Sequence, residues 1–491
     1  MMSSEVTVTY LNIILYAVSY QLQRPIEPFL VRSLIRDQSD SSSSSNYNNE
    51  EESTANQTYG RLTSFFSLIQ TIGSPLVGTL LDRIGPKRTS ILVYGASACS
   101  YWILAHSTTP TWLYCSKIPT LLQHAFLVGQ ATVASLPESK DEDIASATKR
   151  RAAALGRMTT AYTIGATIGP ALGGYLASTD LYAGARLAVW GSLVSVILSI
   201  IYLKDHPKKH KEDSKEDSPA SAQQSGTQST SFLQSIQKTL SYLRHPTIGP
   251  LMFIKFLNGV SSSAFTTVLP LILANKLQFS TTQMGYFMSA SSLSVAAFAA
   301  VGISPAMAYM GNQPDRLAFV GIGCRLVSMV VFGVVVSWVM SMSTMASFEE
   351  NIITISTKGL MATTLASVTV SISSHMHATS LTTLTTGTVS TEERGAILGL
   401  EHGLFSMARI VGPPLGTTLL ARGPASSFIS ELGAGGLWKV ILVCILMDFV
   451  LMALLKVWST REYTKIKTID SKTDGDSMPC RPLMEDHDHS D

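Results

Sequence analysis

The stretch that decides the fold runs from Arg151 to Leu176 and reads R-A-A-A-L-G-R-M-T-T-A-Y-T-I-G-A-T-I-G-P-A-L-G-G-Y-L. A second stretch, Arg394–Leu419, repeats its frame without a gap. The matching residues are Arg394, Leu398, Gly399, Gly412, Pro413, Leu415, Gly416 and Leu419, at the positions of Arg151, Leu155, Gly156, Gly169, Pro170, Leu172, Gly173 and Leu176. Because both stretches are apolar, the repeat indicates a doubled membrane protein with this helix once in each half.

The distribution of charge supports a membrane protein. Charged residues make up 14% of the 491-residue chain, against roughly 25% in an average soluble domain. Three stretches, 36–58, 204–246 and 459–491, hold 31 of the 70 charged residues. Between these stretches run apolar segments of about twenty residues, the length that crosses roughly 30 Å of hydrocarbon. The five cysteines have no paired spacing, so they predict neither a disulfide framework nor a metal site.

The chain is therefore predicted to be an all-α membrane protein with twelve transmembrane helices in two pseudo-symmetric six-helix halves. The spans are expected at 7–32, 59–81, 89–107, 112–136, 152–178, 184–203, 248–274, 283–305, 317–340, 357–386, 395–420 and 437–458. The expected divisions are an N-terminal half (1–203), a cytoplasmic linker (204–246), a C-terminal half (247–458) and a cytoplasmic tail (459–491). The end of the linker, Phe232–Leu243, has apolar residues near helical spacing and predicts an amphipathic helix on the membrane surface.

Basic residues set the predicted orientation. Lys/Arg clusters follow the even-numbered spans, whereas the opposing segments carry few basic residues. By the positive-inside rule both termini and the linker are cytoplasmic, in the plasma membrane or an endomembrane. The first exoplasmic loop, 33–58, then holds Asn56-Gln57-Thr58, which makes Asn56 the candidate glycosylation site.

Two motifs carry a family resemblance. Between the second and third spans stands G-T-L-L-D-R-I-G-P-K-R, Gly78–Arg88. The chain resembles the major facilitator superfamily, whose loop motif reads G-x-x-x-D-R/K-x-G-R-R/K-R/K. The loop residues that match it are Gly78, Asp82, Arg83, Gly85, Lys87 and Arg88, while Pro86 replaces the central basic residue. The family's antiporter motif, G-x8-G-x3-G-P-x2-G-G, matches Gly156, Gly165, Gly169, Pro170, Gly173 and Gly174.

Within the superfamily the chain looks most like the tetracycline-resistance-like drug:H⁺ antiporters and the solute carrier family 22 member 18 type. Lys117, in S-K-I-P, stands where relatives show an arginine in S-R-L-P. The resemblance implies that the Gly78–Arg88 loop latches the halves on the cytoplasmic side and that the bend at Pro170 biases which side opens. The plainer alternatives are a topogenic basic loop and a tightly packed small-residue stripe.

Ionisable residues inside the spans are the candidates for the transport path, since charges facing lipid cost at least ~2.5 kcal/mol each. Arg24 and Glu27 are three apart and are expected to pair, either structurally or in the path. Lys117 and His124 are seven apart and are expected to share a helix face. The remaining candidates are Lys255, Asn258, Glu401, His402 and Arg409, with surface snorkelling as the alternative for Lys255. The expected order for proton coupling is Glu27, Glu401, His124 and then His402.

These features predict secondary transport of a small organic solute by alternating access, as a proton-coupled organic cation or drug antiporter. The alternatives are a facilitator or symporter of an anionic or neutral metabolite and a non-transporting receptor or scaffold. No nucleophile–base constellation predicts an enzyme, and no motif predicts a cofactor. The expected partners are a small-molecule substrate, the lipid bilayer and protons. The chain is expected to act as a monomer and to bind no nucleic acid.

Overall fold

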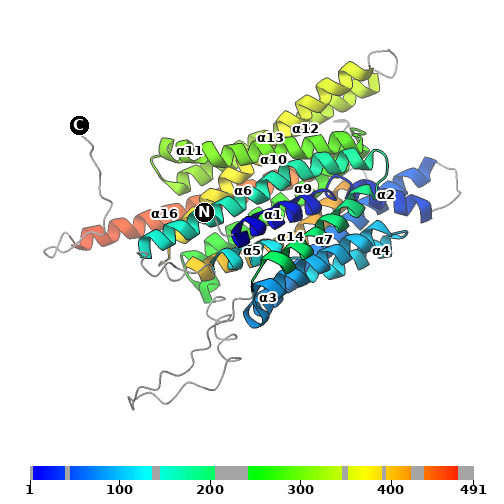
Figure 1. The fold of residues 1–491 in the computed structure, drawn as a ribbon. Helices are drawn as coiled ribbons and strands as arrows, with labels where there is room; N and C mark the ends of the chain where they lie inside the picture. The colour runs from blue at the N-terminus through cyan, green and yellow to red at the C-terminus, as the bar shows by residue number, and fades with distance from the viewer. Residues whose placement is uncertain are drawn as a thin grey trace, which may run out of the picture.

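A computed structural model describes residues 4–38, 45–134, 144–204, 241–345, 352–389, 394–421 and 436–473. Within these ranges the regular structure is entirely helical. The helices lie roughly side by side in one elongated bundle (Figure 1). The expected amphipathic helix at Phe232–Leu243 lies, up to residue 240, outside the described residues.

The first half of the chain forms α1 to α7 and the second forms η2 to α16. The helices of the first half are α1 (Ser4–Gln21), α2 (Glu27–Gln38), α3 (Ser45–Ala105), α4 (Pro110–Lys117), η1 (Ile118–Leu122), α5 (Ala125–Ala134), α6 (Ile144–Ala177) and α7 (Ala183–Tyr202). Those of the second are η2 (Tyr242–Arg244), α9 (Ile248–Asn275), α10 (Thr281–Val301), α11 (Ile303–Tyr309), α12 (Pro314–Met345), α13 (Ile352–Gly387), α14 (Arg394–Ala421) and α16 (Gly436–Thr473).

The two ends of the bundle are distinguished by the contacts between helix termini. At one end, here named the terminal end, Trp458 near the end of the apolar part of α16 donates a hydrogen bond of 2.8 Å to the carbonyl of Thr247, before α9. Ser459 donates one of 2.9 Å to Asp315 in the first turn of α12. The opposite, far end holds the α6–α7 connection and the end of α9, where Lys276 pairs with Glu52 of α3.

Two predicted spans break well inside their length, and a third, 283–305, passes from α10 into α11 near its end. The first span breaks between α1 and α2, at residues 22–26, and the fourth breaks at η1. Each break contains a proline, Pro25 or Pro119, which lacks the N–H that a continuous helix needs. The loop expected at 33–58 is also wrong at both ends, because residues 33–38 belong to α2 and residues 45–58 form the start of α3. The breaks matter because they place ionisable side chains at helix ends inside the bundle.

The second and third spans form one long helical element, α3, with a sharp change of direction at Gly85. Gly85 has φ 79° and ψ 171°, a conformation open essentially to glycine alone. The Thr89 hydroxyl donates to the Gly85 carbonyl at 2.7 Å and fixes the start of the next segment. The backbone conformation therefore requires a glycine at this position of the loop motif.

Six helices in the described part of the chain are long and apolar enough to cross a membrane by length and composition. They cover Glu50–Leu81, Ala183–Tyr202, Ile248–Asn275, Thr281–Val301, Pro314–Met342 and Gly436–Arg461. The other predicted spans are shortened by breaks, as in α1 and α4, or diluted by glycine, serine and threonine, as in α6, α13 and α14.

The two copies of the repeat pack in the same way, each on the first helix of its own half. Gly169 of α6 lies against Gln21 of α1, and Gly412 of α14 lies against the backbone of α9 at Val260. Between helices in a bilayer, association depends on close packing because lipid is as apolar as the side chains. The repeated glycines supply that close approach in both halves.

The second copy lacks the glycine that stands at position 165 of the first, and the partner helix compensates for this difference. In the first half Gly165 of α6 faces Ala17 of α1, where an added Cβ would lie 2.5 Å from the Ala17 Cβ. In the second half Ala408 of α14 faces Gly259 of α9 instead, at 2.7 Å by the same measure. In each half one glycine thus faces one alanine where the two helices cross. The glycine belongs to α6 in the first half and to α9 in the second. The alanine at position 408 therefore preserves the spacing of the helices.

The halves meet through α6 with α10 and through α3 with α14. Gly174 and Gly285 form a backbone contact, where a Cβ on Gly174 would lie 2.9 Å from the Gly285 Cα. Nearby, Thr282 donates to the Gly174 carbonyl at 3.3 Å. Both helices are at the far end of the bundle at this point, since α6 ends and α10 begins there. The far end is therefore closed.

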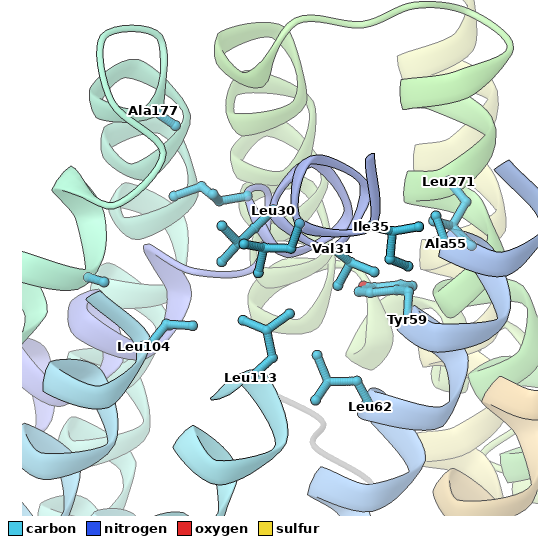
Figure 2. Close-up of a cluster of buried hydrophobic side chains, with 13 residues drawn as sticks. Leu30, Val31, Ile35, Ala55, Tyr59, Leu62, Leu104, Leu113, Ala177 and Leu271 are labelled. Carbon is cyan, nitrogen blue, oxygen red and sulfur yellow. The ribbon is translucent and has the colours of Figure 1, made fainter. Parts of the chain in front are cut away.

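An apolar cluster completes this closure (Figure 2). It takes Leu30, Val31 and Ile35 from α2, Tyr59 from α3 and Leu271 from α9, among others. In Figure 2 the α2 side chains point down towards Leu113 and Leu62. Because Leu271 belongs to the second half, the cluster contains side chains from both halves.

Candidate functional site

A small cavity of about 80 Å³ lies between the halves, next to the break in the first span. Its charged lining residues are Arg24, Glu27, Lys117 and Arg409. Aromatic rings from Tyr20, Tyr59, Phe66 and Tyr101 complete much of the wall. Pockets that bind drug-sized ligands have volumes of about 300–1,000 Å³. The cavity in this conformation is smaller than that and has room for only a few waters.

Glu27 and Lys117 form an ion pair in this cavity. Glu27 is the first residue of α2 and Lys117 the last of α4, so both breaks in the predicted spans present a charge at the same place. Their side chains are 20% and 12% exposed, and the Lys117 ammonium also lies 5.5 Å from the centre of the Phe66 ring. The expected pairing of Arg24 with Glu27 is wrong, because the break at Pro25 rotates Glu27 towards α4.

Arg24 and Arg409 reach the cavity from different halves. Arg24 precedes α2 and Arg409 lies midway along α14. Within the described part of the chain neither guanidinium has an ion-pair partner. Three cations thus face one carboxylate in the lining, and the carboxylate is already paired with one of them. The cavity carries an excess of positive charge.

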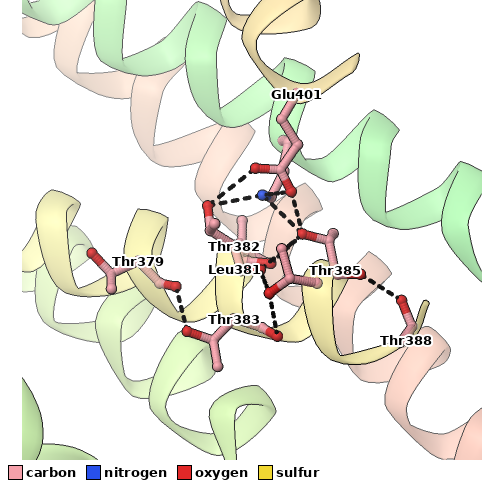
Figure 3. A network of polar contacts seen from close by, with 9 residues as sticks. Thr379, Leu381, Thr382, Thr383, Thr385, Thr388 and Glu401 are labelled. Atoms are coloured by element: carbon pink, nitrogen blue, oxygen red, sulfur yellow. Dashed lines mark hydrogen bonds and ion pairs between the residues drawn. The ribbon is translucent and has the colours of Figure 1, made fainter. Parts of the chain in front are cut away.

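A second polar cluster lies nearer the terminal end, within the second half (Figure 3). The Lys255 ammonium of α9 pairs with Glu401 of α14, and both side chains are 10% exposed. Lys255 also donates to the hydroxyls of Thr382 and Thr385 on α13, at 3.0 and 3.1 Å. These two hydroxyls bond the Glu401 carboxylate in turn, Thr382 at 3.2 Å. Lys255 therefore does not extend to the membrane surface; its charge is neutralised inside the bundle.

Asn258, expected in the cavity, faces the core of the second half instead. Its side-chain oxygen accepts a hydrogen bond from Arg325 of α12, which pairs through two nitrogens with Asp448 of α16. Arg325 and Asp448 are fully buried, with 0% exposure. Ser262, one turn beyond Asn258 on α9, lies 3.4 Å from the same guanidinium. This cluster joins three helices of one half and does not line the central cavity.

The histidine candidates lie away from these clusters. The break at η1 separates His124 from Lys117, so the expected common face does not form. His124 packs beside Gly73 of α3, and its Nε2 is buried without a hydrogen-bond partner among the described residues. His402 is exposed on α14. Of the four residues expected to couple protons, only Glu27 lines the cavity.

The motif residues are distributed along the bundle. Gly78 and Gly156 have open space where a side chain would lie. Arg83 and Arg88 are exposed and Lys87 is half-buried. The side chain of Asp82 is not among those that the structure describes. Gly173 packs against the Leu22 backbone, at the break after α1. The antiporter-motif helix thus supports the chain segment that leads directly to Arg24 and Glu27.

Asn56 is not in an exposed loop. It lies in α3, is 3% exposed, and its side-chain oxygen accepts a hydrogen bond of 3.0 Å from Asn275 of α9. Arg32 donates to the same Asn275 side chain at 3.3 Å. In this conformation the Asn56 amide is occupied in a contact between the halves and is inaccessible for glycosylation.

Some residues of these clusters were missing from the expected set. Arg325 lies in an apolar run and meets the same criterion, an ionisable residue inside a span, that identified Lys255. Thr382 and Thr385 could not be singled out, because α13 is rich in threonine along its whole length. These two hydroxyls differ from the other threonine hydroxyls of α13 only in their contact with Glu401 of α14.

A doubled helical bundle with a charged cavity between its halves defines the class of multi-pass membrane transport proteins. The profile of the Major Facilitator Superfamily matches residues 9–413, and the chain belongs to this family. This membership and the solved structures confirm the predicted all-α membrane fold, and the family and its structural neighbours are transporters, as predicted, and not enzymes.

Individual relatives are distant. Mouse (Mus musculus) solute carrier family 22 member 18 is 25% identical over 376 residues, which cover 74% of this chain and 80% of that protein. Multidrug resistance protein 2 of Bacillus subtilis is 24% identical and covers 48% and 54% of the two chains. Among solved structures, an inward-facing bacterial homologue of the human lysosomal transporter Spinster has a TM-score of 0.62 at 14% identity, covering 93% and 96%. These comparisons define the fold and the transporter class.

Proposed function

We propose that this protein transports a small organic anion across the membrane by alternating access. The observation that carries the proposal is the charge of the central cavity, where Arg24, Lys117 and Arg409 face a single carboxylate, Glu27. In a site of low dielectric this excess favours an anion and opposes a cation. The anionic substrate of the alternative prediction is thus favoured over the organic cation that the motif suggests.

The two unpaired arginines suggest how binding drives closure. Arg24 belongs to the first half and Arg409 to the second. A carboxylate or phosphate bound between them would form charge-assisted hydrogen bonds to both halves at once. Closing of the halves around the anion would therefore gain interactions that the open states lack, as alternating access requires.

Glu27 gives a route for proton coupling. An anion that takes Lys117 as a partner leaves the Glu27 carboxylate without its counter-ion in a largely buried site. A proton carried on Glu27 would remove the competition between this carboxylate and the anion for Lys117, so binding of the proton and of the anion would favour each other. Proton and anion would then move in the same direction, as symport. Glu401 is the weaker candidate, because both its oxygens are already engaged by Lys255, Thr382 and Thr385.

Flux in proteoliposomes tests the proposal. Radiolabelled small mono- and dicarboxylates and a panel of organic cations are offered with an inward-directed proton gradient, and then without it. Saturable anion uptake that the gradient accelerates is expected. Lys117→Gln should reduce that uptake at least tenfold, since one charge-assisted hydrogen bond is removed. Lys204→Gln, an exposed cation beyond α7, is the matched control and should leave uptake unchanged.

A drug or organic-cation antiporter is the second candidate. The name of the Bacillus subtilis relative refers to multidrug resistance, and the aromatic rings around the cavity could hold a cation by cation–π contacts. Cation flux that is accelerated by an opposed proton gradient, together with no anion flux, would replace the first proposal by this one. No saturable flux of any tested solute would favour a receptor or scaffold.

We infer that the terminal end faces the cytoplasm. Its support is the group of basic residues there, which includes Arg83, Lys204, Arg244 and Arg461. In a background without native cysteines, Lys204→Cys should resist a membrane-impermeant thiol reagent in intact cells, whereas Lys276→Cys at the far end should react if the protein is in the plasma membrane. The reverse pattern would invert the orientation.

A further inference from the structure

A second cavity lies away from the one between the halves, at the terminal end between α12 and α16. Its volume is about 420 Å³, and Arg316, Phe319, Val320, Leu455, Lys456 and Thr460 contribute to its lining. Arg316 and Lys456 come from different helices, and both are exposed. The cavity therefore opens on the outside of the bundle, at the level where helices leave the apolar part of the membrane.

The polar part of this cavity carries net positive charge. Within the described part of the chain Arg316 and Lys456 form no ion pair. The one carboxylate in the lining, Asp315, accepts a hydrogen bond of 2.9 Å from Ser459. Two cations and one carboxylate in the lining leave an excess of one positive charge. Guanidinium and ammonium groups with hydroxyls beside them are suited to phosphate oxygens.

The apolar part of the cavity continues along the two helices towards the middle of the membrane. Phe319 and Val320 are 38% and 37% exposed at the cavity itself. Further along, the outer faces of both helices carry exposed apolar side chains, among them Val327 and Val330 on α12 and Phe449 and Val450 on α16. A cationic pocket thus lies at the end of a long apolar surface.

We propose that this cavity binds the headgroup of an anionic phospholipid. The phosphate would lie between Arg316 and Lys456, and the acyl chains would follow the exposed apolar faces of α12 and α16. Anionic lipids are attracted to basic residues next to a membrane span, and basic pockets between spans bind such headgroups. A soluble phosphate would satisfy the two cations but would leave the apolar surface without a role. The site is separate from the central cavity and does not depend on which solute is transported.

Native mass spectrometry of the full-length protein released from detergent tests the proposal directly. The protein is titrated with dioleoyl phosphatidic acid, and separately with dioleoyl phosphatidylcholine of the same acyl composition. Retention of phosphatidic acid at lower concentrations than phosphatidylcholine is expected. The double variant Arg316→Gln/Lys456→Gln should weaken phosphatidic acid binding at least tenfold, since charge-assisted hydrogen bonds are lost. Lys456→Arg keeps the charge and should retain the binding.

Three controls make the result decisive. Lys204→Gln and Arg244→Gln remove exposed cations at the same end of the bundle and should leave phosphatidic acid binding unchanged. Competition by inorganic phosphate or glycerol phosphate at equal phosphate concentration would show a soluble-phosphate site and overturn the lipid assignment. Equal binding of phosphatidic acid by the wild type and the double variant would also overturn it. The melting temperature in phosphatidylcholine should be the same for both, which shows that the variant is folded.

Discussion

Lys117 and Glu27 form an ion pair although they lie 90 positions apart, one at the end of α4 and the other at the start of α2. Each sits beside a proline-containing break in a membrane span. An unbroken first span would instead place Glu27 on the face of Arg24. The two breaks therefore determine which cation neutralises the carboxylate and which cation remains available in the cavity.

A double-mutant cycle measures this pair. Glu27→Gln and Lys117→Gln each leave one charge without its partner in a largely buried site, so the double variant should be destabilised by less than the sum of the two single effects. We expect a coupling energy of about 0.5–3 kcal/mol from denaturant unfolding in detergent micelles. The exposed Asp180–Arg186 pair is the control and should give less than about 1 kcal/mol. Additive single effects at Glu27 and Lys117 would contradict the pair.

The buried pair Arg325–Asp448 should be much more sensitive. Asp448→Asn leaves the Arg325 guanidinium buried without a counter-charge, which costs about 3–5 kcal/mol. The double variant Arg325→Met/Asp448→Leu removes both charges and should recover much of this loss. Unfolding of the three proteins in the same detergent checks the order of stability. A double variant no more stable than Asp448→Asn would show that Arg325 and Asp448 have roles beyond neutralising each other.

The backbone contact between the halves predicts a conformational effect of a single methyl group. In Gly285→Ala the new Cβ would overlap the Pro170 carbonyl and lie 3.0 Å from the Gly174 Cα. The far end should therefore open. Nitroxide labels at Thr179→Cys and Ser280→Cys, in a background without native cysteines, should report a longer distance in Gly285→Ala than in the parent. Gly156→Ala, where a Cβ meets open space, is the control and should leave the distance unchanged.

The loop between α6 and α7 should make a small pH-dependent contribution to stability. The Arg186 guanidinium, hydrogen-bonded to Asp180, lowers the pKa of that carboxyl below its usual value, and the N–H of Tyr182, at 2.8 Å, acts in the same direction. Because the folded pKa is the lower one, the stabilisation is present above the unfolded pKa of about 3.9 and is lost as the pH falls below it.

Asp180→Asn removes this dependence. The melting temperature of the wild type should fall more steeply than that of the variant as the pH is lowered through this window, while the two differ little in slope near neutral pH. Identical slopes at acid pH would show that solvent screening at this exposed loop cancels the contribution.

The architecture could be predicted from the sequence because the internal repeat and the apolar runs each indicate it independently. The repeat between Gly169 and Gly412 recurs in the packing of both halves. The expected spans 184–203, 248–274 and 395–420 match α7, α9 and α14 within one residue at each end, whereas α3, α6 and α16 extend at least eight residues beyond the expected spans. The breaks at Pro25 and Pro119 were missed, because a proline inside an apolar run is compatible with either a kink or an interruption. The pairing of charges was missed for the same reason, since helical spacing predicts contacts only along an unbroken helix.

The residues of the cavity were only partly predictable. Arg24, Glu27, Lys117 and Arg409 were identified as ions inside spans, and the structure brings all four together. The same rule also selected Lys255 and Asn258, which belong to other clusters. Whether an ionisable side chain faces the cavity or the core of its own half depends on the rotation of its helix. That rotation is set by packing against neighbours far away in sequence, such as α9 against α14.

The Gly174–Gly285 contact also has a consequence for the thermodynamics of opening and closing. Side chains that order at an interface lose rotamer freedom, at a cost of up to about 2 kcal/mol for the long flexible types. Two glycines have no rotamers to lose, so the halves can separate and rejoin at this point with little change in side-chain entropy. A contact of this kind can be closely packed and still require little free energy to separate in each transport cycle.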